Sequence, residues 1–84
     1  MFKILLSKDA ADFLGHLDFQ AKERIKKKLE ILETDPYPQG VQKIIGTKNI
    51  FRLRIGDYRA LYFVDYLTNT IIVDKIDKRS RVYK

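Results

Sequence analysis

"RLRIGDYRALYF", residues 52–63, decides the fold class, because it predicts a β-hairpin. Apolar and charged residues alternate before the turn, which is the period of two of a strand with one buried face. Gly56 and Asp57 suit a two-residue turn, since glycine supplies the positive φ of a type II′ turn. Residues 58–65 then form the returning strand. "TIIVDKI" at 70–76 is a further strand, rich in β-branched residues.

Three arginines of this hairpin are expected on one face of the sheet. Arg52 and Arg54 alternate with apolar residues that point toward a core, namely Phe51, Leu53 and Ile55. Arg59, on the returning strand, is expected on the same side as the other two arginines. A strand gains little from arginine itself, so the face that carries these residues is a candidate binding surface.

Two helices are predicted between a first strand at residues 2–6 and the hairpin. Ser7 is expected to cap the first helix, whose apolar residues recur at spacings of three and four. Asp18 is expected to cap the second helix, which runs to about Glu33 and ends at a loop with two prolines.

The order β-α-α-β-β-β predicts an α+β fold, in which an N-terminal two-helix hairpin packs on one face of an antiparallel β-sheet. With 84 residues, the chain is expected to be a single domain, 1–84, with one small core. The edge at which the first strand joins the sheet stays open.

The charge of the chain predicts an anionic partner. Lys and Arg number 17 against 11 Asp and Glu, which gives a net charge of +6 and a pI of about 9.7. This balance predicts attraction to nucleic acid, an anionic membrane or an acidic protein, and a basic surface without a specific partner is the alternative. Residues 22–28 carry five cations on a predicted helix, a pattern more typical of a solvated helix face than of a binding surface.

Composition excludes several chemistries. The absence of cysteine excludes disulfides and thiolate catalysis and fits a cytoplasmic location. A single histidine, His16, leaves no histidine pair for acid–base catalysis and no multi-histidine metal site. The glycines stand in separate turns, so no phosphate-binding loop is present, and neither metal nor cofactor is expected. The short apolar run at the N-terminus is expected to be neither a signal peptide nor a membrane span.

Guanidinium groups are the remaining candidate chemistry. Arginine binds phosphate as a planar, bidentate donor and stays charged at physiological pH. Arg79, Arg81 and Tyr83 follow the last strand, where they are positioned to extend the arginine face of the hairpin. The natural ligand of such a face is a nucleic-acid backbone. The alternative is that the arginines pair with acidic neighbours or simply face solvent.

The hairpin and the terminal "KRSRVYK" resemble the RelE/ParE toxin superfamily of prokaryotic toxin–antitoxin systems. The resemblance covers nearly the whole chain, because "FKILLSKDAADFLGHL" and "IKKKLEILETDPYP" are similar to the opening strand and helices of that family. Its most specific parts are "GDYRALY" and "KRSRVY", which stand in the family's order and separation.

The resemblance implies a ribosome-dependent endoribonuclease that cuts mRNA in the ribosomal A site. It also implies an acidic, RelB-like antitoxin that wraps the toxin in a hetero-oligomer. The family's functional positions fall on Arg52 and Arg54 in the hairpin, Arg59 in the strand, Arg79 or Arg81 as the late arginine, and Tyr83. Two features depart from the family: the hairpin cations are arginines rather than lysines, and the segment from the late arginine to the tyrosine is shorter.

In this interpretation the catalytic residues are Arg59, Arg79 and Tyr83, and the substrate-binding residues are Arg52, Arg54 and Arg81. The arginines neutralise the phosphate while the ribose 2′-hydroxyl attacks it, and the tyrosine stacks on a base or transfers a proton. Arginine is a poor proton acceptor, because a pKa above about 12 leaves almost no free base near neutral pH. The ribosome is therefore expected to supply much of the rate. A ParE-like DNA gyrase inhibitor and a noncatalytic nucleic-acid-binding domain stay open as alternatives.

Overall fold

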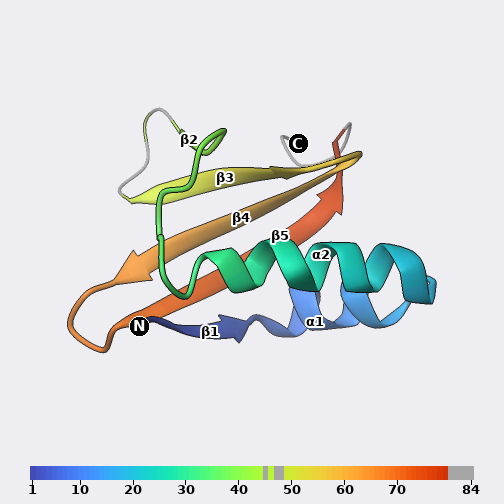
Figure 1. Ribbon diagram of the computed structural model, residues 1–84, viewed down its shortest axis with the longest axis horizontal. Helices are drawn as coiled ribbons and strands as arrows, with labels where there is room; N and C mark the ends of the chain where they lie inside the picture. The colour runs from blue at the N-terminus through green and yellow to red at the C-terminus, as the bar shows by residue number, and fades with distance from the viewer. Residues whose placement is uncertain (45, 47–48, 80–84) are drawn as a thin grey trace.

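A five-stranded sheet forms the frame of the computed structural model (Figure 1), which describes residues 1–44, 46 and 49–79. The elements in chain order are β1 (Lys3–Leu6), α1 (Lys8–Gly15), α2 (Phe19–Ile31), β2 (Gln42–Lys43), β3 (Ile50–Ile55), β4 (Tyr58–Asp65) and β5 (Thr70–Lys78). The predicted α+β class is confirmed. Two predicted site residues, Arg81 and Tyr83, lie outside the described residues.

The strands lie in the order β1-β5-β4-β3-β2. β4 lies between β3 and β5 and pairs antiparallel with both, as the sequence predicts. β1 instead pairs in parallel with β5, with Lys3–Leu6 opposite Thr70–Val73, so the sheet is mixed rather than wholly antiparallel. Parallel neighbours need a long connection, and the helices and intervening strands provide one. The short β2 adds a strand at the other edge, where it pairs with Phe51 and Arg52.

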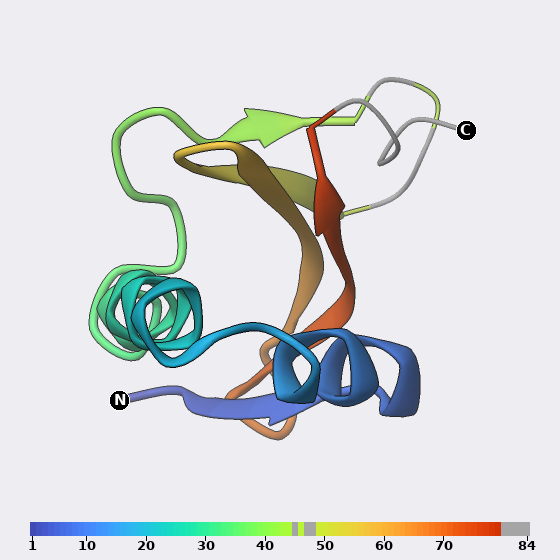
Figure 2. The same ribbon diagram turned by 90° about the vertical axis from the view of Figure 1, so that its right-hand side faces the viewer.

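Both helices begin at the predicted caps. Ser7 Oγ accepts a hydrogen bond from Ala10 N at 3.0 Å, and Asp18 Oδ1 accepts one from Ala21 N at 2.8 Å. Each bond satisfies an amide that the first helical turn leaves without an intrahelical partner. In Figure 2, α2 is seen nearly along its axis and α1 lies obliquely to it. Among the described residues, neither helix is long and apolar enough to cross a membrane.

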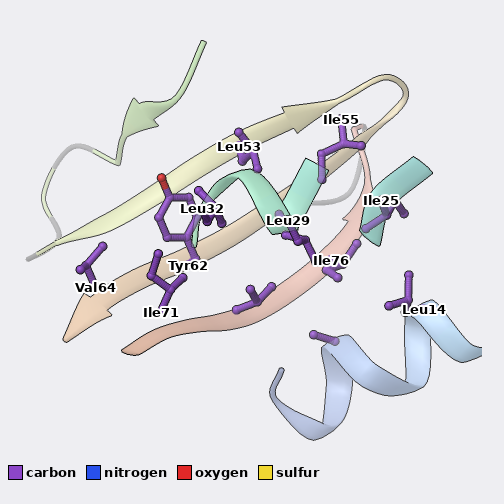
Figure 3. Close-up of a cluster of buried hydrophobic side chains, with 13 residues drawn as sticks. Leu14, Ile25, Leu29, Leu32, Leu53, Ile55, Tyr62, Val64, Ile71 and Ile76 are labelled. Carbon is purple, nitrogen blue, oxygen red and sulfur yellow. The ribbon is translucent and has the colours of Figure 1, made fainter. Parts of the chain in front are cut away.

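The core lies between the helices and one face of the sheet (Figure 3). Leu53 and Ile55 are buried as the alternation predicts, whereas Phe51 is partly buried. Tyr62 is fully buried, and its hydroxyl donates to Pro36 O at 2.6 Å, which ties the loop after α2 to the sheet. The other buried apolar residues are Ala10, Leu14, Ile25, Leu29, Leu32, Ala60, Val64, Ile71, Val73 and Ile76.

An irregularity in β5 sets which side chains face outward. The β4–β5 register shifts between Leu61 and Tyr62, which leaves Asp74 without a partner on β4. This bulge lets Val73 and Ile76 both face the core, although a regular strand would place residues three apart on opposite faces. Beyond the bulge, β5 runs past the β3–β4 hairpin turn.

Candidate functional site

Strand alternation places three arginines on the sheet face opposite the helices. Leu53 and Ala60 are buried against the helices, so their neighbours on β3 and β4 point the other way. Those neighbours are Arg52, Arg54 and Arg59, and Arg54 lies directly opposite Arg59 in the antiparallel register. The structure therefore brings the three hairpin arginines together on one face.

Arg59 is the most enclosed predicted site residue that the structure describes, with 9% of its surface exposed. Its Nη1 donates to Gly56 O at 2.9 Å and to Tyr58 O at 2.8 Å, two carbonyls at the hairpin turn. Gly56 has the predicted positive φ, 58°, which makes the tight turn possible. The two bonds fix the guanidinium at the turn. Its Nε and Nη2 make no hydrogen bond within the described part of the chain and are available to a ligand.

The surroundings of Arg59 are strongly positive. Burial lowers the pKa of Arg59 below its ordinary value, and the neighbouring charges that lower this pKa further are those of Arg54, Arg79 and Arg52. Asp57 acts in the opposite direction and is the weakest influence. Where the structure describes both partners, no ion pair involves Arg54, Arg59 or Arg79. Acidic neighbours therefore do not account for these three arginines, and a bound anion would relieve their repulsion.

Arg79 joins this group because β5 passes the hairpin turn. Its backbone amide donates to Asp57 O at 2.8 Å, and its side chain is exposed. A surface hollow of about 550 Å³ beside it is lined by Asp57, Tyr58, Lys78 and Arg79. The sequence did not single out Lys78, because its approach to the turn depends on the pairing and bulge of β5, which strand alternation does not reveal.

A residue of the neighbouring strand β2 holds the side chain of Arg52. Gln42 lies opposite it in the β2–β3 register, and Arg52 Nη2 donates to Gln42 Oε1. The sequence left "VQKII" undecided between strand and connector, so Gln42 was not predicted as a partner. A strand of two residues has no periodicity that could have revealed it.

This arrangement can bind and neutralise phosphate, but it offers no ready proton acceptor. His16 lies at the end of α1, where its Nδ1 is 2.6 Å from Asp12 O. Within residues 1–44, 46 and 49–79, no three His, Cys, Asp or Glu side chains are grouped so that they could hold a metal ion. The predicted contributions of Arg81 and Tyr83 fall outside the described residues.

These features define a small, basic α+β protein whose guanidinium groups gather at one hairpin. The family model described as the ParE toxin of the type II toxin–antitoxin system parDE matches residues 4–83. The chain belongs to this family, within the RelE/ParE toxin superfamily that its hairpin and terminal motifs resemble. It is a toxin of a toxin–antitoxin system of the RelE/ParE type.

Related proteins align with this chain over almost its full length. RelE1 of Methanocaldococcus jannaschii is 29% identical over an alignment 86 residues long, which covers 99% of this chain and 96% of the relative. A chain of the archaeal RelE–RelB complex from Pyrococcus horikoshii OT3 is 29% identical, with a TM-score of 0.82 over 96% of this chain and 98% of that one. A chain of the intact RelBE toxin–antitoxin complex of E. coli is 23% identical, with a TM-score of 0.81 over 96% and 100%. The last similarity concerns the fold alone.

Proposed function

We propose that this toxin inhibits translation as a ribosome-dependent endoribonuclease that cuts mRNA in the A site. The observation that supports the proposal is the arginine group at the β3–β4 turn. Arg59 is enclosed and fixed there, keeps Nε and Nη2 available, and lies among other guanidinium groups. A phosphodiester gains negative charge as it is cleaved, and fixed cations in a partly desolvated site stabilise that charge.

In the proposed reaction, the ribose 2′-oxygen bonds to the adjacent phosphorus while the bond from phosphorus to the next 5′-oxygen breaks. The products are a 2′,3′-cyclic phosphate and a 5′-hydroxyl. Arg59 and Arg79 neutralise the phosphorane, and Arg52 and Arg54 position the RNA backbone. Tyr83 is assigned to base stacking or proton transfer on the resemblance to the family, and Arg81, two residues before it, to substrate binding.

The proton balance explains why the ribosome is needed. The 2′-hydroxyl must lose one proton and the leaving 5′-oxygen must gain one. A lowered pKa makes Arg59 a better proton donor than an ordinary arginine, which helps the second transfer, but arginine stays a poor acceptor near neutral pH. Alignment of the 2′-oxygen with the phosphorus must therefore come largely from how the ribosome holds the mRNA.

The proposed partner that controls this activity is an acidic antitoxin, which forms a hetero-oligomer with the toxin. The solved complexes from P. horikoshii and E. coli are RelE–RelB complexes, and this chain shares the fold found in them. A net charge of +6 favours association with an acidic protein. Isothermal titration against the product of the neighbouring reading frame tests the pairing, and absence of binding would contradict it. Because the proposed target is the ribosome, the proposed location of the toxin is the cytoplasm.

A translation extract tests the activity. Wild-type toxin should produce cuts in mRNA at A-site codons, which primer extension maps, and should leave naked RNA largely intact. Arg59→Ala should lower the cutting rate at least tenfold, because it removes the fixed guanidinium. Lys8→Ala is the matched control, since Lys8 is exposed and paired with Asp12 on α1, away from the hairpin. Equal cutting of naked RNA would contradict the ribosome dependence.

A ParE-like DNA gyrase inhibitor is the second candidate, because the matching family model is that of the ParE toxin. A gyrase supercoiling assay separates the two functions. Inhibition of supercoiling without mRNA cutting would replace the proposed function. RNA binding with neither effect would indicate a noncatalytic nucleic-acid-binding protein.

A further inference from the structure

A second basic surface lies on the other side of the β3 edge from Arg59. A groove of about 350 Å³ separates α2 from the end of β3. The residues that line it are Arg24, Lys27, Lys28 and Ile31 from α2, and Arg54, Ile55 and Gly56 from the hairpin. Four of these seven residues are cations and none is acidic. We call this site the α2–β3 groove.

The cations of the α2–β3 groove have no counter-ions among the described residues. The ion pairs in that part of the chain are Lys8–Asp12 and Lys26–Glu23, and neither reaches the groove. Arg24 crosses to the hairpin turn, where a Cβ placed on Gly56 would lie 3.6 Å from Arg24 Nη1. Cations gathered in this way repel one another, and a polyanion would relieve the repulsion.

The side of α2 that faces β3 carries an excess of positive charge. The acidic residue Glu30, together with Glu33, lines a different pocket, whose other walls are Ile4 and Leu6 of β1, Leu14 of α1, and Lys26 and Leu29 of α2 itself. The cations Arg24, Lys27 and Lys28 line the side toward β3. Lys26 lies with Glu30 in the other pocket and pairs with Glu23, so the two signs mix there, whereas the side toward β3 carries cations alone. This local excess of cations favours a binding surface over a merely solvated helix face.

Arg54 connects the α2–β3 groove to the arginine group on the outer sheet face. It lies opposite Arg59 in the β3–β4 register, and it also lines the groove. Within the described residues, no strand pairs with Arg54 at the β3 edge, because the β2–β3 register ends at Arg52. Positive charge is therefore continuous around the edge, from Arg59 through Arg54 to α2.

The lining of the groove indicates what kind of polyanion fits. It contains no aromatic side chain on which a base could stack, and it contains no hydrogen-bond acceptor side chain for base edges. Its polar side chains are all cationic donors, for which phosphate oxygens are the strongest acceptors on a nucleic acid, so the lining favours the phosphate backbone, as in the shape-based binding of RNA duplexes. Arg24 and Lys28 are separated by about 6 Å along the helix, a span of about two phosphates of one strand.

We propose that the α2–β3 groove binds the phosphate backbone of double-stranded RNA, as a contact separate from the cleavage site at Arg59. The assignment of this duplex to ribosomal RNA rests on the proposed function. The binding of duplex RNA to the groove does not depend on that function, so it can be tested without any cleavage.

The binding test uses the full chain and a fluorescently labelled 20-base-pair RNA duplex, with anisotropy measured over a range of salt concentrations. The triple variant Arg24→Ala/Lys27→Ala/Lys28→Ala should bind the duplex at least tenfold more weakly near 0.1 M salt. Its log–log salt slope should be smaller by about 2 to 3, roughly one unit for each lost phosphate contact. Lys3→Ala/Lys8→Ala/Lys26→Ala removes the same charge outside the groove and should keep a slope close to wild type.

Equal weakening by the two triple variants would overturn the proposal, because net charge alone would then explain the binding. Arg24→Lys/Lys27→Arg/Lys28→Arg keeps the charges and should restore the slope, which separates lost contacts from a damaged helix. Circular dichroism checks the folding of all variants. If the groove variant binds the duplex normally but loses affinity for an acidic antitoxin, the groove is a protein interface and the proposal fails.

The toxin concentration for half-maximal cutting and the maximal cutting rate together test whether the groove contacts ribosomal RNA. In a translation extract, the groove variant should need at least tenfold more toxin for half-maximal cutting while the maximal rate stays near wild type. Arg59→Ala should lower the maximal rate instead. If wild-type toxin cuts nothing, the proposed function fails while the duplex measurement still decides the groove.

Discussion

Arg59 shows how the candidate site works against the stability of the fold. Its side chain is largely buried, faces Arg54 across the hairpin, and makes two hydrogen bonds to carbonyls of the turn. Burial and like charges both lower its pKa, which means that folding disfavours its charged form. The fold retains an unfavourable charge at this position, which is expected where an anion has to be bound.

Arg59→Met should therefore increase stability while it removes activity. Methionine keeps an unbranched side chain of similar length and loses the desolvated charge, so the free energy of unfolding should rise by up to about 2 kcal/mol. Urea unfolding at neutral pH measures this change, and the translation extract should show no cutting. A loss of more than about 1 kcal/mol would show that the bonds to Gly56 O and Tyr58 O outweigh the repulsion.

Tyr62 gives the fold a dependence on alkaline pH. Burial raises the pKa of Tyr62, so the folded protein keeps the hydroxyl protonated when an unfolded tyrosine ionises. The stability that this provides is complete below pH about 10 and is lost as the pH rises further, by roughly 1.4 kcal/mol per pH unit. Tyr37 has its pKa raised to about 12 by burial and by its hydrogen bond to Tyr66, but its exposure makes its effect smaller.

Tyr62→Phe tests this dependence. At pH 8 the variant should lose about 1 kcal/mol, because Pro36 O no longer receives its hydrogen bond. The difference from wild type should shrink or reverse by pH 11, because phenylalanine does not ionise. Urea unfolding of both proteins at pH 8, 10 and 11 measures it, and the contribution of other titrating groups cancels in the difference. A difference that stays constant over this range would contradict the assigned ionisation.

At the scale of elements, Ser7 connects a helix to the sheet. Its Oγ accepts from Ala10 N to cap α1 and donates to Asp74 O, at 2.6 Å, in the bulge of β5. Within the part of the chain that the structure describes, the Asp18 side chain makes the capping bond of α2 and no second hydrogen bond. Ser7→Ala should therefore cost about 2 kcal/mol of unfolding free energy and Asp18→Ala about 1 kcal/mol.

Ser7→Asp separates the two roles of Ser7, because an aspartate can cap the helix but cannot donate to Asp74 O. Its loss of stability should lie between those of wild type and Ser7→Ala in urea unfolding. If Ser7→Ala and Asp18→Ala are equally destabilising, the bond to the bulge contributes nothing to stability.

The elements that the sequence predicted well are those with a strong local signal. Ser7 and Asp18 mark the helix starts, and the alternation around Gly56 gives the hairpin and the face of Arg59. The parallel position of β1, the bulge at Asp74 and the pairing of Gln42 depend on contacts between distant segments, so no local pattern reveals them. The same reason applies to the α2–β3 groove, whose cations gather only when α2 lies against β3.

At the scale of the whole molecule, positive charge extends from the outer sheet face around the β3 edge to α2. Arg54 is the residue common to both parts, because it opposes Arg59 and also lines the α2–β3 groove. Two separate anion sites would respond independently to substitution, whereas a shared residue affects both. Substitution of Arg54 therefore shows whether the two surfaces contact RNA together in one complex.

Arg54→Ala should alter both the maximal cutting rate and the salt dependence of duplex binding, whereas each of the other variants alters mainly one of them. The maximal cutting rate should fall, as in Arg59→Ala, and the salt slope for duplex binding should decrease by about 1, as expected for one lost phosphate contact. In double-variant comparisons, Arg54→Ala should be non-additive with Arg59→Ala in cutting rate, because the two residues are paired in the β3–β4 register. Lys28→Ala with Arg59→Ala should be additive, because Lys28 lines the α2–β3 groove and Arg59 does not. Lys3→Ala, at the opposite edge of the sheet, should change neither the rate nor the slope. If Arg54→Ala changes only one of the two measurements, Arg54 serves a single site and the two basic surfaces bind RNA separately.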